Sequence, residues 1–123
     1  MTDACFHLRH GPVDVHAHMT PADFPPDPCG EPRWPCMQRR SWTDATVMIA
    51  DKPFRQLDER SWDVKRRIED MDRDGIAAQA LSPMPELLSY WFAADAAEAF
   101  ADIVNADLAR QVSLAPSRFV GLG

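Results

Sequence analysis

A short apolar run between two helical patterns constrains the fold of this chain more than any other feature. The run IAAQALS covers residues 76–82, is bounded by Gly75 and Pro83, and lacks the polar alternation of a half-exposed strand. Buried strands of parallel sheets commonly have this composition. The segment before it is typical of a helix that begins at Ser61 or Asp63 and ends at Gly75. Its apolar residues recur at helical spacing, at Val64, Ile68 and Met71.

Strand-like and helix-like segments alternate on both sides of this run. A β-branched strand is expected at residues 13–15, an amphipathic helix at about 95–115, and a further strand at 118–123. The apolar stripe of the long helix consists of Phe100, Ile103, Val104, Leu108, Val112 and Ala115. Strands that alternate with helices predict parallel pairing with right-handed crossovers, so the expected fold class is α/β with about three strands.

The segment between the first strand and the first helix has a different character. Prolines are dense from residue 21 to 35, so no helix can pass through this part. Farther on, residues 46–49 and 54–57 are typical of two strands joined by a turn at 51–53. We therefore expect residues 20–58 to be an insertion after the first strand, carrying a small hairpin, within a single domain of residues 1–123. Trp34, Trp42 and Trp62 are expected to pack this insertion.

The bulk composition excludes several classes of function. The chain has 123 residues and a formal net charge of −6, which argues against nucleic acid as a partner. No apolar run approaches the roughly 18 residues of a membrane span, and no signal peptide is expected. Three cysteines at irregular spacing favour a reducing compartment, so a cytoplasmic location is expected.

The motif GPVDVHAH places two histidines at the end of the first strand. His16 and His18 are two residues apart, so they project to the same face with Cα atoms about 7 Å apart. Two imidazoles at that spacing can reach one metal ion, and ligands of α/β folds bind beyond the carboxyl ends of strands. Asp14 is expected on the same face, with Val13 and Val15 packed on the other. The alternative is a chance His-x-His at the rim of a sheet.

Four motifs carry a family resemblance. VDVHAH resembles the opening of amidohydrolase superfamily members, which are (β/α)8 barrels. The later motifs RRIEDMDRDGI, LSYWF and RFVGLG are similar to those of the α-amino-β-carboxymuconate-ε-semialdehyde decarboxylase family. The resemblance runs from about Val13 to Gly123. It implies that this α/β chain is the N-terminal part of a TIM barrel.

The resemblance also implies an activity and its residues. It implies a non-oxidative decarboxylase that depends on zinc, or on manganese in some relatives, and needs no organic cofactor. His16 and His18 match the first two metal ligands, and Arg55 matches an arginine that holds a substrate carboxylate. The implied substrate is a carboxylated muconate semialdehyde or a related carboxylated aromatic or diene. The full-length protein is implied to be a homodimer without nucleic-acid or membrane partners.

The residues that would complete such a site are not in this sequence. The family takes a further histidine ligand, a histidine acid/base and an aspartate ligand from later strands, so no catalytic residue is assigned here. His7 and His10 precede the first strand and are expected to be tail residues. Because catalytic zinc usually has three protein ligands, the chain is expected to be an N-terminal fragment that is inactive by itself.

Two other readings of the sequence stay open. His-x-His and the barrel pattern serve a metal-dependent hydrolase of the same superfamily equally well. The chain could instead be a non-catalytic truncated product, or a module that pairs through its open sheet edge. Ser82 is expected either to face the site or to cap the turn before Pro83, and Tyr90 and Trp91 either to line the pocket mouth or to cover the barrel.

Overall fold

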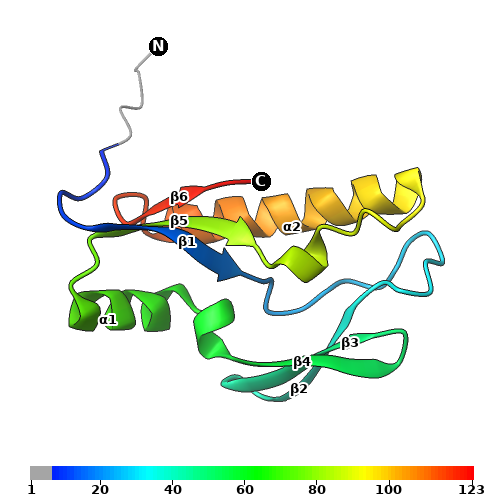
Figure 1. Ribbon diagram of the computed structural model, residues 1–123. Helices are drawn as coiled ribbons and strands as arrows, with labels where there is room; N and C mark the ends of the chain where they lie inside the picture. Colours follow the sequence, from blue (N-terminus) through cyan, green and yellow to red (C-terminus); the bar gives the residue numbers. More distant parts are fainter. Residues whose placement is uncertain (1–6) are drawn as a thin grey trace.

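A computed structural model describes residues 7–123 and contains two separate sheets (Figure 1). The first is parallel, in the order β1-β5-β6, and consists of β1 (Val13–Met19), β5 (Ala78–Pro83) and β6 (Phe119–Gly121). The second is antiparallel, in the order β2-β3-β4, and consists of β2 (Cys36–Ser41), β3 (Asp44–Ile49) and β4 (Lys52–Asp58). Two α-helices and two 3₁₀ turns connect the strands: η1 (Glu59–Ser61), α1 (Val64–Asp74), η2 (Pro85–Leu87) and α2 (Ala94–Leu114).

The mixed α/β class expected from the alternating pattern is confirmed. The parallel sheet has three strands, and α1 and α2 lie between consecutive strands of it along the chain (Figure 1). Within residues 7–123, neither helix is both long and apolar enough to cross a lipid bilayer.

Helix α1 begins and ends at the residues that the sequence indicates. The Asp63 side chain accepts a hydrogen bond from the Arg66 backbone N–H at 3.2 Å, which satisfies a donor that the first helical turn leaves free. At the other end Gly75 adopts a left-handed conformation with φ of 73°, which glycine reaches without the steric penalty of a Cβ atom. Local capping chemistry therefore determines both ends of this helix.

The core consists of two apolar clusters that α2 connects. One cluster lies between the parallel sheet and both helices: Ala17, Met19, Val64, Met71, Leu81, Leu108 and Phe119. The other packs the amino-terminal half of α2 against the proline-rich segment and the turn after β5: Trp34, Met84, Leu87, Phe92, Ala96, Phe100 and Val104. Trp34 and Trp62 are buried as expected, whereas Trp42 is 53% exposed and stacks edge-on against Trp62 instead of filling the core.

The antiparallel sheet is larger than the expected hairpin. Strands β3 and β4 contain the predicted runs, but the turn is at Ala50 and Asp51, both with positive φ, while Lys52 and Pro53 already belong to β4. Two successive left-handed residues match the twist of a tight hairpin, which explains the earlier turn. Strand β2 was not predicted, because its sequence CMQRRS has no apolar alternation.

Strand β2 is attached to its neighbour by a two-fold arginine–carboxylate contact. Arg40 donates from Nε and Nη2 to the two carboxylate oxygens of Asp44, each at 2.6 Å, and Gln56 donates to Asp44 at 3.2 Å. These bonds favour the ionised carboxylate, so Arg40 first and then Gln56 lower the pKa of Asp44 to about 2. At pH values above the usual carboxyl pKa this contact stabilises the folded state, and the stabilisation is lost as the pH falls toward 2.

Replacing Arg40 with glutamine is expected to return the pKa of Asp44 toward 3.8, its ordinary value. A carbon-13 NMR titration of the Asp44 carboxyl group between pH 1.5 and 6, by design about two units either side of the ordinary value, measures this directly. Arg33→Gln, which removes an arginine outside the sheet, serves as the control and should leave the titration unchanged. An Asp44 that titrates at the same pH with and without Arg40 would contradict the assignment.

Candidate metal centre

The two histidines of β1 converge at the carboxyl end of the strand. Their Nε2 atoms lie 3.1 Å apart, and their rings are edge-on with centroids 5.0 Å apart. His16 is exposed and His18 is half-buried. The period-two reasoning therefore placed both side chains correctly with respect to each other, on the same face and close enough to share one partner.

The contacts of Nδ1 of His18 show that its other ring nitrogen, Nε2, is the one free to bind a metal. Its Nδ1 lies 3.2 Å from the carbonyl oxygen of Pro83 and 3.0 Å from Oγ of Ser82, both at the end of β5. A carbonyl can only accept, so we assign the proton to Nδ1, which leaves the lone pair on Nε2. Metal-binding histidines are usually held in this way by a bond from their other nitrogen. Ser82 faces the histidine pair, as one of the two sequence interpretations proposed.

The spacing of the two Nε2 atoms fits one metal ion. Nitrogens bound to a tetrahedral zinc at 2.0–2.1 Å are about 3.3–3.4 Å apart, close to the observed 3.1 Å. Without metal, an N–H of His16 can donate to the His18 lone pair over the same distance. No group of three or more histidine, cysteine, aspartate or glutamate side chains is placed to hold a metal in residues 7–123. The described residues thus bring two potential metal ligands together at the end of β1.

Asp14 does not share the histidine face, contrary to expectation. A β-bulge between Asp14 and Ala17 adds one residue to β1, so that Asp14 pairs with Gln79 while His18 pairs with Ser82. Gln79 and Ser82 are three residues apart on β5 and therefore point to opposite faces. The side chain of Asp14 accordingly lies on the face toward α1. Val13 and Val15, both expected to be packed, are 46% and 76% exposed.

Arg55 lies on the other sheet and has a partner that the sequence did not indicate. It is on β4, is 55% exposed, and forms an ion pair with Glu86 of η2. The Glu86 side chain is only 9% exposed, and its second carboxylate oxygen has no hydrogen-bond partner in the described structure. Arg55 therefore connects the antiparallel sheet to the turn after β5, and the structure does not place it in contact with the histidine pair.

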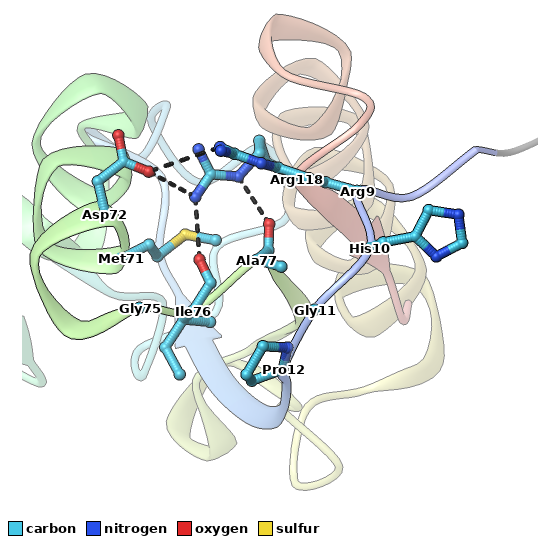
Figure 2. Close-up of a pocket in the computed structure, with 10 residues that line it drawn as sticks. All are labelled: Arg9, His10, Gly11, Pro12, Met71, Asp72, Gly75, Ile76, Ala77 and Arg118. Atoms are coloured by element: carbon cyan, nitrogen blue, oxygen red, sulfur yellow. Dashed lines mark hydrogen bonds and ion pairs between the residues drawn. The ribbon is translucent and has the colours of Figure 1, made fainter.

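The other candidate residues lie away from the histidine pair or at the surface. His10 borders a cavity at the amino-terminal ends of the parallel strands, opposite the end that carries His16 (Figure 2). In this cavity Arg118 donates to the carbonyls of Ile76 and Ala77 and pairs with Asp72, while the His10 ring points away from them. Tyr90 and Trp91 are 83% and 43% exposed.

Two imidazoles converge at the carboxyl end of a parallel sheet. The protein is therefore an α/β protein with a candidate metal centre. Comparison with known proteins narrows this class. No family model matches the chain. A 2-amino-3-carboxymuconate-6-semialdehyde decarboxylase of Dictyostelium discoideum is 34% identical over 113 residues, and one of Caenorhabditis elegans is 34% identical over 114.

Both matches extend over most of this chain but over a minor part of each relative. They cover 90% of this chain, and 32% and 28% of the two relatives respectively. The chain therefore spans about a third of the length of the curated relatives it matches. This enzyme name is a synonym of the α-amino-β-carboxymuconate-ε-semialdehyde decarboxylase indicated by the motifs. The resemblance is thereby confirmed: the chain is related to the 2-amino-3-carboxymuconate-6-semialdehyde decarboxylases.

Proposed function

We propose that this chain is part of a metal-dependent, non-oxidative decarboxylase. The observation that carries the proposal is the convergence of His16 and His18 at a strand end in a chain related to two decarboxylases. The three parallel strands with intervening helices support a single incomplete barrel domain, the N-terminal part of a (β/α)8 barrel, with residues 20–58 inserted after its first strand. A length about three times greater in the relatives is consistent with a complete barrel.

Each candidate residue has a distinct task in this proposal. His16 and His18 would hold the metal through Nε2, with His18 oriented by its bond to Pro83. A divalent metal bound there supplies Lewis-acid chemistry. Arg55 would bind a substrate carboxylate through its planar fork, which requires that carboxylate to share or replace Glu86. In the reaction the bond from carbon to carboxylate breaks, CO2 leaves, and a proton takes its place on the carbon, without net oxidation.

The remaining features of the proposal rest on the family resemblance and on the composition of the chain. The substrate class is a carboxylated muconate semialdehyde or a related carboxylated diene or aromatic. The proposed metal is zinc, which imidazole ligands suit, with manganese as the second candidate from the family resemblance. The whole protein is proposed to be a cytoplasmic homodimer.

The test is an assay of CO2 release by the complete gene product that contains this chain. We expect metal-dependent release from 2-amino-3-carboxymuconate-6-semialdehyde, loss of that release with His18→Ala, and none from the isolated 123-residue chain. The same preparation is given lactones and amides, since a hydrolase of this superfamily would cleave those instead. Hydrolysis without CO2 release, or CO2 release that survives His18→Ala, would overturn the proposal.

A further inference from the structure

A chain of polar contacts behind the histidine pair connects α1 to the backbone of both histidines. Arg67 of α1 donates from Nη2 to the His18 carbonyl oxygen at 2.8 Å and from Nη1 to Gln79 Oε1 at 3.4 Å. Gln79 in turn donates to Asp14 Oδ2 at 3.2 Å, and Asp14 Oδ1 accepts the His16 backbone N–H at 3.0 Å. One guanidinium therefore reaches the main chain at both metal-ligand positions.

The surroundings of Arg67 match a cation held in one orientation. Its Nη2 also donates to the Arg60 carbonyl at 2.6 Å, so the guanidinium bridges η1, β1 and β5. Burial lowers the pKa of Arg67, and the negative charges of Asp14, Asp70 and Asp58 act in the opposite direction. A planar guanidinium presents several donors in fixed directions, which an ammonium group cannot do.

The bulge explains why β1 needs this support. Pairing with β5 is irregular between Asp14 and Ala17, and a bulged residue is left without its ladder hydrogen bond. The backbone under His16 is therefore held by the Asp14 side chain instead of by the sheet. The carbonyl of His18 is held from the other side by α1.

We propose that Arg67 is a positioning residue for the histidine pair. Through His18 directly, and through Gln79 and Asp14 to His16, it fixes the backbone from which both imidazoles project. The inference rests on the proposed function, because a shared metal is what requires the two Nε2 atoms at one spacing. Partners outside the ligand shell typically change metal affinity tenfold to a hundredfold.

The test compares two arginines on the same helix. Arg67→Met keeps the aliphatic part of the side chain and removes the fork, and Arg73→Met makes the same change at a position that is 61% exposed and only pairs with carboxylates. We expect Arg67→Met to speed hydrogen exchange of the His16 amide about tenfold in the metal-free chain. It should also lower zinc affinity about tenfold to a hundredfold. Arg73→Met should change neither.

Two further variants keep the test decisive. Gln79→Leu breaks the link to Asp14 but leaves the bond from Arg67 to His18, so it should speed exchange at His16 even if Arg67→Met fails to fold. Arg67→Lys retains the charge without the fork and should not restore the zinc affinity. A folded Arg67→Met or Gln79→Leu chain with unchanged exchange at His16 would overturn the inference. If the complete gene product binds no zinc at the pair, the proposed function fails, while the exchange comparison in the isolated chain still decides the role of Arg67.

Discussion

Replacing Phe100 with alanine is expected to lower the free energy of unfolding by about 3–5 kcal/mol. The Phe100 side chain is fully buried in α2. Its ring centroid lies 5.0 Å from that of Trp34, 5.7 Å from Phe92 and 5.8 Å from Phe24. Truncation leaves a cavity between the helix and the proline-rich segment. Because this segment has few regular backbone hydrogen bonds, its position depends on packing against Phe100.

Urea unfolding followed by tryptophan fluorescence measures this change, since Trp34 lies in the same cluster. Leu114→Ala is the matched control, because Leu114 is on the same helix but 61% exposed, and it should change the free energy by no more than about 0.5 kcal/mol. Phe100→Leu retains most of the volume and gives a smaller, measurable loss if the alanine variant does not fold. Equal stability of the Phe100→Ala chain and the wild type would show that this cluster does not support the fold.

The second large effect concerns metal binding. We expect the double change His16→Ala and His18→Ala to lower zinc affinity at this site by about a hundredfold or more, since loss of both ligands exceeds the tenfold to hundredfold effect of outer partners. Isothermal titration measures the affinity, and imidazole NMR resonances identify which histidines respond.

His10→Ala provides the control for this experiment. It removes the same type of side chain from the opposite end of the parallel sheet, and exposed thiols of Cys29 and Cys36 remain in all variants. Zinc affinity of the His10→Ala chain should equal that of the wild type. If His10→Ala weakens binding as much as the double change, zinc binds somewhere other than the end of β1.

Local rules predicted the parts of this fold that local chemistry determines. The caps of α1 are Asp63, one of the two start residues that the sequence offered, and Gly75, which the sequence indicated as the end. Two-residue periodicity was enough to predict that His16 and His18 share a face, while the contacts of the His18 ring with Ser82 and Pro83 could not be predicted. The insertion boundaries, the barrel and the ligand roles remain predictions.

Long-range partners determine the parts that sequence reasoning missed. The bulge in β1 moves Asp14 to the other face, and the side chain that holds it there is Gln79, 65 residues away. Strand β2 has no strand-like pattern of its own and is joined to β3 by antiparallel pairing and by the Arg40–Asp44 contact. The partner of Arg55 is Glu86, on an element that no pattern connects to β4. In each case the polar partner lies on another strand or turn, and hydrophobic patterning carries no information about such a partner.

The position of β1 within its sheet has a consequence for how a site could be completed. In the order β1-β5-β6, β1 is an outer strand, so the histidine pair lies beside a row of backbone groups that another strand can bind. A strand that pairs there would align its side chains next to both imidazoles. The open edge of β1 is therefore where a further strand could bring additional side chains up to the histidine pair.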